Sequence, residues 1–415
     1  MSIYNDLKKF TINELLILFF PFALVIGPIV INFVLILASF ILLKDFIFKK
    51  INLELVKTKW FFVCILFIFY NILNAFFSTD QYNALRGSIG QFRFIFFSIF
   101  LLYYIQSLKS LDTMIKIWLL LILFIAIDVI FQNIFSYSLF GIPISISSRP
   151  SSFFGEEVVS GAYLTYISIP IFFYYVQNFN KINFKKKSIY LLVYIIILLA
   201  IVLTSERISL LAFIGSSLVM FLFFFDYKKF FLFFIFFITF FTIIYNSNNI
   251  FKNRINDMGN ILMDVHDSSW GRLWESSHML FMDNFILGVG LKNYRVDCNY
   301  QVDPRPEHPA QFCSTHPHNF LLEMLSETGI TGTVIFYIFF ILLLIKLSQI
   351  YKYDYIKNNF LFHFYGNILI LLIYVWPIKT SGSFFTTFNA SFFWFNMGLA
   401  LCYLKISSKK TYKLH

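Results

Sequence analysis

The sequence predicts an all-α, polytopic membrane protein with about twelve transmembrane helices and one large external loop. Apolar residues fill 59% of the 415 positions and charged residues only 13%, whereas soluble chains contain about 45–50% and about 25%. Phenylalanine alone occupies 59 positions, which is more apolar surface than a soluble core of this size can bury. A water-soluble globule is therefore excluded.

Each predicted crossing is an apolar segment of about 20 residues, the length that spans a bilayer. Gly27 and Pro28 separate the first two segments, which can also form one kinked crossing followed by a shorter one. The polar N-terminus runs into the first segment without a small-residue cleavage site, so we expect a retained helix and no signal peptide. The segments are 11–27, 28–45, 58–77, 90–106, 113–134, 157–178, 188–204, 206–225, 229–246, 319–348, 360–378 and 385–405.

Lysine and arginine fall on different sides of these segments. The connections that carry Lys8, Lys44, Lys109, Lys185 and their neighbouring lysines lie on one side, together with both termini. Because cytoplasmic loops are rich in cations, this side is predicted to be cytoplasmic. Orientation thus accounts for the net charge of +11 without nucleic acid. The arginines lie on the other side or within helices: Arg86, Arg93, Arg149, Arg207, Arg254, Arg272, Arg295 and Arg305.

This partition suits an external polyanion. Arginine forms paired hydrogen bonds to phosphate oxygens, whereas lysine acts as a point charge. A coding bias toward lysine throughout the chain would produce the same partition without any ligand, and the count alone does not decide between the two.

The chain divides into three parts along its length. N-terminal helices, about nine of them, cover 1–246, a large hydrophilic segment covers 247–318, and about three C-terminal helices and a cytoplasmic tail cover 319–415. The charge rule makes the middle part external, and within it SSWGRLWESSHMLF predicts a short amphipathic helix at the membrane surface. Cys298 and Cys313 lie in the same part, where an oxidising compartment would allow a disulfide.

One motif stands at the end of the large external segment. His316-Pro317-His318-Asn319 precedes FLLEMLSETGITGT, so nine residues separate Asn319 from Gly329. This pattern resembles that of the O-antigen ligase family, membrane glycosyltransferases whose polymerase relatives share the same core. Blocks in the same order extend the resemblance over roughly residues 14–350: ALRGSIGQFRF after Ser78-Thr79-Asp80, IDVIFQNIFSYSLFGIP, RPSSFFGEEVVSGAYL, TSERISLLAF and GRLWESSHMLFMDNFILGVGLKNY.

The resemblance implies transfer of a glycan from undecaprenyl diphosphate to an acceptor hydroxyl, with inversion, at the periplasmic face of a bacterial inner membrane. A single large external loop favours a ligase that uses a lipid A-core sugar hydroxyl, because polymerases of the superfamily commonly carry two. The alternatives are a polymerase, whose acceptor is a second lipid-linked glycan, and a protein O-oligosaccharyltransferase. A transporter would also fit twelve helices, but transporters tend to show internal repeats. The sequence shows no such repeat, and its helix interiors are almost uncharged, with the polar residues gathered at one face.

His318 is the predicted catalytic residue. It lies where the external loop re-enters a helix, and a neutral imidazole there can take the proton of the acceptor hydroxyl. In an alternative role, His318 takes no proton and only positions the acceptor through a hydrogen bond. His316 and Asn319 are candidate substrate ligands, although Asn319 is also a favoured helix cap.

The donor's diphosphate is predicted to bind arginines. Arg207 and Arg272 would stabilise the charge that develops as the glycosidic bond breaks. Arg86 and Arg93, seven residues apart on one helix face, are expected to line the same cavity, and Arg149 is a further candidate ligand. We expect these arginines and His318 to share one pocket at the outer leaflet.

Simpler roles exist for each arginine. Arg207 can pair with Glu206 or with lipid headgroups, Arg272 can belong to the solvated face of a loop helix, and Arg86 or Arg93 can pack against Glu156 or Glu157.

No metal or cofactor is expected. A zinc site would have to be built from His308, His316 and His318 with Asp303 or Glu307. These residues lack the fixed helical spacing that makes such motifs convincing, and the four cysteines show no zinc-binding spacing.

Overall fold

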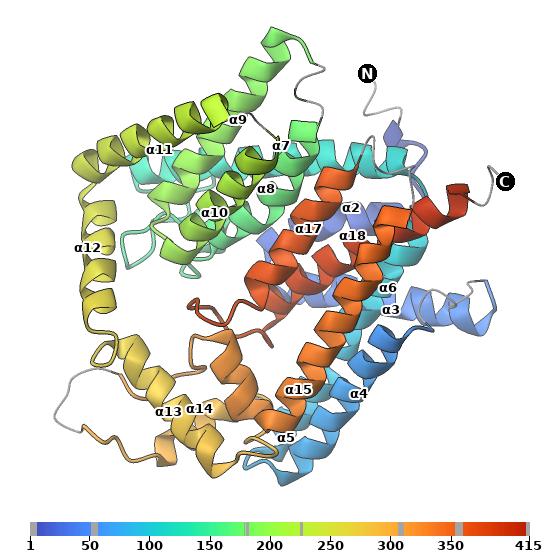
Figure 1. The fold of residues 1–415 in the computed structure, drawn as a ribbon, viewed down its shortest axis with the longest axis vertical. Coiled ribbons are helices and arrows are strands. Elements are labelled where there is room, and N and C mark those ends of the chain that lie inside the picture. The colour runs from blue at the N-terminus through green and yellow to red at the C-terminus, as the bar shows by residue number, and fades with distance from the viewer. Residues whose placement is uncertain are drawn as a thin grey trace. The chain divides into compact units, whose positions relative to one another are not determined.

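A computed structural model describes residues 6–50, 57–177, 179, 182–224, 227–305, 311–352 and 360–411, which fold mainly into helices. In this part of the chain each of the twelve predicted apolar segments contains a helix (Figure 1). The fold class is thus confirmed as all-α. The helices are α2 (Ile12–Ile26), α3 (Pro28–Ile47), α4 (Lys59–Asn74), α6 (Phe92–Tyr104), α7 (Leu108–Phe135), α8 (Ser160–Gln177), α9 (Phe184–Leu203), α10 (Arg207–Phe224), α11 (Tyr227–Ser247), α15 (Phe320–Ser348), α17 (Leu361–Tyr374) and α18 (Thr387–Thr411).

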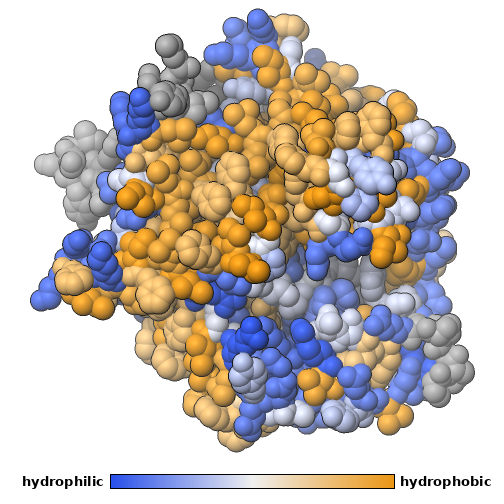
Figure 2. All heavy atoms as spheres, turned by 180° about the vertical axis from the view of Figure 1, so that it is seen from behind, coloured by the Kyte–Doolittle hydropathy of each residue, from blue (hydrophilic) through white to orange (hydrophobic). Residues whose placement is uncertain are grey.

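Several of these helices suit a membrane. Among the described residues, six helices are long and apolar enough to cross a bilayer, or seven if 234–247 and 249–261, which meet at 108°, form one broken span. Figure 2 shows wide areas of apolar side chains on the molecular surface, which lipid and not water would cover. The chain is therefore a multi-pass membrane protein, and its twelve crossings and external loop remain predictions.

Local sequence signals set the helix ends. Thr11 and Glu14 form a capping box at the start of α2. Gly27, with a φ of 126°, ends this helix, and Pro28 begins α3 at a position where its missing N–H costs little. The first two apolar segments are thus two separate helices.

The described chain forms two compact units. The first comprises Met1–Ile31, Gln106–Asn260 and Ile356–Ile370, and the second Asn32–Ile105, Ile261–Tyr355 and Leu371–His415. In the first unit α7 packs against α8 and α9, and α8 against α10. In the second unit α18 packs against α6, and α15 lies along α4 and α13 (Figure 1). The division predicted from the sequence, into 1–246, 247–318 and 319–415, concerns membrane topology. The two compact units do not test it.

The large hydrophilic segment is partly helical. It contains α12 (Asn249–Met263), α13 (Ser269–Asp283) and the short α14 (Tyr294–Asp297). The amphipathic helix predicted from SSWGRLWESSHMLF is α13, and its buried face includes Leu273, Leu280 and Phe281. Outside this segment, the helix α5 (Gln81–Ile89) directly precedes α6.

Helix α15 is broken at Gly329, where the backbone adopts φ 62° and ψ −175°. The segment 285–290 lies against this break as a strand would. The Val289 N–H donates to the Ser326 carbonyl at 2.9 Å, and the Gly290 N–H to the Glu327 carbonyl at 2.8 Å. The carbonyl groups released by the break are therefore satisfied by the loop that follows α13.

Two side chains of α4 complete this junction. The Tyr70 hydroxyl donates to the Thr328 carbonyl at 2.9 Å, and the Asn74 amide donates to the Leu287 carbonyl at 2.8 Å. A Cβ on Gly329 would collide with the Ile286 carbonyl, so glycine is required there for its conformation and for its size. Hydrogen bonds among α4, α15 and the segment 285–290 thus stabilise the backbone crossing.

We expect Gly329→Ala to lower the stability by at least about 1–3 kcal/mol, because alanine is strained at this φ and ψ and its methyl group has no room. The matched control is Gly215→Ala in α10, where a Cβ meets nothing within 4 Å. That change should be neutral or stabilising by up to about 1 kcal/mol. Thermal unfolding of the purified protein in detergent measures both, and equal midpoints for the two variants would contradict the strain at Gly329.

Candidate functional site

The His-Asn motif forms the entrance to α15. The Asn319 side-chain oxygen accepts the Leu322 N–H at 3.0 Å, so its role as helix cap is confirmed. Its amide nitrogen donates to the Pro377 carbonyl at 2.8 Å. One side chain therefore starts the helix and also holds the segment that follows α17.

His318 has an unusual backbone. Its φ is 53°, in the left-handed region, which costs a residue with a Cβ about 1–3 kcal/mol and is typical of functional sites. The Ser381 N–H donates to the His318 carbonyl at 2.8 Å and fixes this conformation. The rings of His316 and His318 lie with their centroids 4.0 Å apart. The two imidazoles therefore form a pair at the mouth of α15.

Both imidazoles are neutral at pH 7. Burial lowers the pKa of His316 to about 3, and the neighbouring charges of His318 and Arg295 act in the same direction. Burial also lowers the pKa of His318 below its ordinary value of 6.5. A neutral imidazole is the form that accepts a proton, so His318 is in the state that a general base requires.

A segment after α17, residues 377–387, contacts several parts of this entrance, and we refer to it as the strap. Besides its bonds to Asn319 and His318, its Phe384 N–H donates to the Glu323 carboxylate at 2.8 Å. Its Thr387 hydroxyl lies 3.4 Å from a guanidinium nitrogen of Arg93. Burial lowers the pKa of its Lys379 to about 8. The strap thus links the histidine pair to Arg93 within the second unit.

Two buried carboxylates lie one helical turn apart on α15. Glu323 and Glu327 are each only 2% exposed. Glu327 accepts the Tyr294 N–H at 3.4 Å, while its second oxygen finds no partner among the described residues. The charge of Arg295 acts on both side chains. Sequence reasoning missed this pair, although two glutamates within an apolar segment signal a functional site.

Four cations gather on neighbouring elements of the second unit. Arg86 lies on α5, Arg93 on α6, Arg295 on α14, and Lys292 in the loop before α14. Burial lowers the pKa of Lys292, and the positive charges of Arg93, Arg295 and Arg86 lower it further. The structure therefore brings Arg86 and Arg93 together, as expected, and adds two cations that the sequence analysis did not single out.

Arg272 is enclosed instead of open to a ligand. Its guanidinium is 0% exposed and forms an ion pair with Asp303. It also donates to the Arg305 carbonyl at 3.0 Å and lies 5.4 Å from the centre of the Phe312 ring. Two of its nitrogens, Nε and Nη1, have no hydrogen-bond partner within the described ranges. This burial does not support the solvated helix face, and a diphosphate would have to displace Asp303.

The loop around Arg272 is held at several points. Cys298 and Cys313 form a disulfide with a Cα–Cα distance of 5.4 Å. Arg305 forms ion pairs with Asp267 and with Glu275 of α13. The peptide that leads to His316 is therefore fixed by a covalent bond and by charges.

Arg149 and Arg207 lie in the first unit, together with Arg254 of α12. Arg149 donates to the Thr204 carbonyl at 2.9 Å, and the charges of Arg254 and Arg149 act on Arg207. The Glu206 carboxylate accepts the N–H groups of residues 161 and 162 at 2.6 and 2.9 Å, at the start of α8. Glu206 thus caps α8, which accounts for a partly buried carboxylate at this position.

A metal site receives no support from the described residues. Among them, no three His, Cys, Asp or Glu side chains gather as a metal ion would require. Glu307 and His308 lie outside the described residues.

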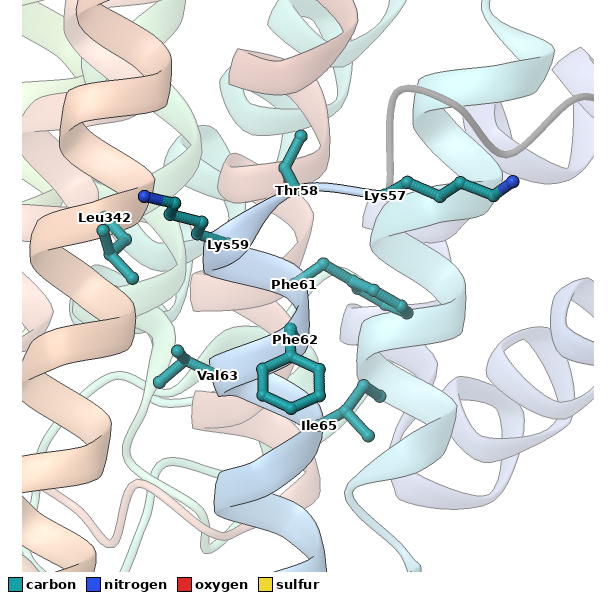
Figure 3. Close-up of a pocket in the computed structure, with 8 residues that line it drawn as sticks. All are labelled: Lys57, Thr58, Lys59, Phe61, Phe62, Val63, Ile65 and Leu342. Atoms are coloured by element: carbon teal, nitrogen blue, oxygen red, sulfur yellow. The ribbon is translucent and has the colours of Figure 1, made fainter.

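A cavity of about 600 Å³ lies at the N-terminal end of α4. Figure 3 shows its lining, with Phe61, Phe62 and Ile65 from α4 and Leu342 from α15. Asn74, which contacts the α15 junction, is about 20 Å farther along the helix. This apolar cavity is therefore separate from the histidine pair and from the four cations.

Comparison with known protein families gives a match to part of the chain. Residues 192–337 match a family model described as O-antigen ligase. We therefore assign this region to the O-antigen ligase family. The assigned region includes Arg207, Arg272, Lys292, His318 and Glu327, and the family resemblance stated from the motifs is confirmed for it. No curated protein matches the chain.

Arg272 lies in the region that matches the O-antigen ligase family, and substitution can test whether it stabilises the fold or binds the ligand. We expect Arg272→Met to destabilise the protein by about 3 kcal/mol, because it leaves Asp303 without its buried partner. The double variant Arg272→Met, Asp303→Asn should recover much of this loss. Thermal unfolding in detergent checks both. A single variant that unfolds like the wild type but no longer binds a prenyl diphosphate would show that Arg272 acts on the ligand instead.

Proposed function

We propose that this protein is an O-antigen ligase, which transfers a glycan from undecaprenyl diphosphate to a sugar hydroxyl of lipid A-core at the periplasmic face of the inner membrane. The observation that carries the proposal is the pair of His316 and His318, which lies in the region that matches the O-antigen ligase family. The positive charge of Arg295 acts on His316 of this pair. A transferase of this kind needs a base for the acceptor and positive charge for the leaving group.

The proposed reaction is a single displacement. His318 takes the proton of the acceptor hydroxyl as its oxygen attacks the anomeric carbon of the donor sugar. The bond between that carbon and the diphosphate oxygen breaks at the same time, which inverts the anomeric centre. The products are the glycosylated acceptor and undecaprenyl diphosphate, and no metal or cofactor takes part.

The proposed role of the cations is to stabilise the leaving diphosphate. Its negative charge grows as the glycosidic bond breaks, so fixed cations favour the transition state over the ground state. Arg86 and Arg93 are the proposed ligands in the second unit. For Arg207 and Arg149, which belong to the first unit, a role on the diphosphate stays a prediction from the sequence. Arg272 is not among them because its guanidinium is buried against Asp303.

Deleting the gene and separating the lipopolysaccharide on a gel tests the acceptor. Loss of all polymer-bearing core supports the ligase. Core that carries a single repeat unit would indicate a polymerase, the alternative left open by the family match. Unchanged lipopolysaccharide together with altered glycoproteins would indicate a protein O-oligosaccharyltransferase.

We expect His318→Asn to reduce transfer at least about a hundredfold, the lower end of what a general base contributes. Asparagine tolerates the left-handed backbone at this position, so the protein should still fold. His278→Asn, at an exposed position of α13, is the matched control and should keep wild-type activity. Transfer measured with purified donor and acceptor decides, and normal activity in His318→Asn would sink the assignment of the base.

The pH dependence of transfer follows from the lowered pKa of His318. The base acts only when neutral, so activity should fall as the pH drops through the pKa of His318, which burial holds below its ordinary value of 6.5. An initial-rate profile between pH 4.5 and 8 measures this midpoint. A midpoint above 7, or a rate that rises with acidity, would contradict a neutral base.

A further inference from the structure

Lys292 occupies a backbone conformation that disfavours lysine. Its φ is 64°, in the left-handed region, where a side chain costs about 1–3 kcal/mol and glycine costs nothing. The lysine lies between Gly290 and Asn293, in a loop that already contains two left-handed glycines, Gly288 and Gly290. Glycine would adopt this conformation at a lower cost, so the surroundings of the lysine side chain decide whether Lys292 has a function.

The side chain of Lys292 lies along α5. A Cβ on Gly87 would be 3.4 Å from Lys292 Cδ and 3.5 Å from Cε, so the absence of a side chain at Gly87 leaves room for the lysine stem. The loop is tied to the start of α5, where the Asp80 N–H donates to the Asn293 side chain at 2.7 Å. The position of Lys292 next to Arg86 is therefore fixed from both sides.

The charges around Lys292 are mostly of its own sign. Arg86, Arg93 and Arg295 act on it, and the carboxylate that acts on it is Glu327, on the buried side. Within the described parts of the chain, none of these four cations forms an ion pair with a carboxylate. The buried carboxylates Glu323 and Glu327 are the anions that face this group, so positive charge remains in excess. The four cations repel one another, and a bound anion would relieve this repulsion.

We propose that Lys292 and Arg295, together with Arg86 and Arg93, form a binding site for a phosphate-bearing substrate group, in which the strained backbone of Lys292 aims its ammonium at the phosphate. The inference rests on the proposed function for the origin of this group. The phosphate belongs either to the diphosphate of the lipid-linked donor or to a phosphorylated sugar of the acceptor.

The test is direct binding to the full-length protein in detergent, without transfer. Farnesyl diphosphate represents the donor, and lipid A-core, intact or treated with phosphatase, represents the acceptor. Lys292→Gly removes the charge and relieves the left-handed strain, so it should unfold no earlier than the wild type. Lys49→Gly is the matched control, because Lys49 also has a positive φ, 55°, and is exposed at the end of α3.

We expect Lys292→Gly to weaken binding of one of the two probes about tenfold, the effect of one lost charge-assisted hydrogen bond, and Lys49→Gly to leave both affinities unchanged. Lys292→Asn, which keeps a side chain suited to this backbone, should behave like Lys292→Gly. Weaker farnesyl diphosphate binding assigns the site to the donor. Weaker binding of intact lipid A-core, but not of the dephosphorylated form, assigns it to the acceptor.

Wild-type affinity of Lys292→Gly for both probes would overturn the inference, as would an equal loss in Lys49→Gly. Failure of the proposed function looks different, because binding is measured without transfer. If the wild type transfers no glycan but binds a phosphate-bearing probe in a manner that depends on Lys292, the ligase proposal fails and the binding site stands.

Discussion

The structure of the second unit depends on one backbone junction, the crossing of the segment 285–290 over the break in α15. Gly329 interrupts the helix, and the freed carbonyls of Ser326 and Glu327 are taken up by the loop after α13. Because a buried carbonyl without a partner costs about 1–3 kcal/mol, the break and the loop stabilise each other. The junction fixes where the loop continues, and Lys292 and Arg295 follow it directly.

The proposed function makes two electrostatic demands on the site. A general base must be neutral, whereas a diphosphate needs several fixed positive charges nearby. Burial meets the first demand at His318, and the positive charge of Arg295 further disfavours a proton on the adjacent His316. Arg295, one of the cations that would hold an anion, thus also disfavours the protonated form of His316.

Sequence patterns predicted the features that depend on neighbouring residues. Apolar length located the helices of the twelve predicted segments, α13 followed from its amphipathic pattern, and Asn319 caps α15 as its residue type suggests. These patterns could not predict contacts between segments that lie far apart in the sequence. The burial of Arg272 depends on Asp303, thirty-one positions away, and the importance of Glu323 depends on a strap that follows α17. The sequence only allowed a bridge between Cys298 and Cys313, and the path of the loop brings the two cysteines together.

Asn319 shows how tightly this entrance is specified. Its oxygen is occupied by a helix N–H and its nitrogen by the Pro377 carbonyl, fifty-eight positions away. Aspartate would reproduce the acceptor and lose the donor, and in serine a single hydroxyl oxygen would have to serve both partners. Several residue types begin helices equally well. The hydrogen bond to the Pro377 carbonyl, on a distant segment of the chain, favours asparagine among them.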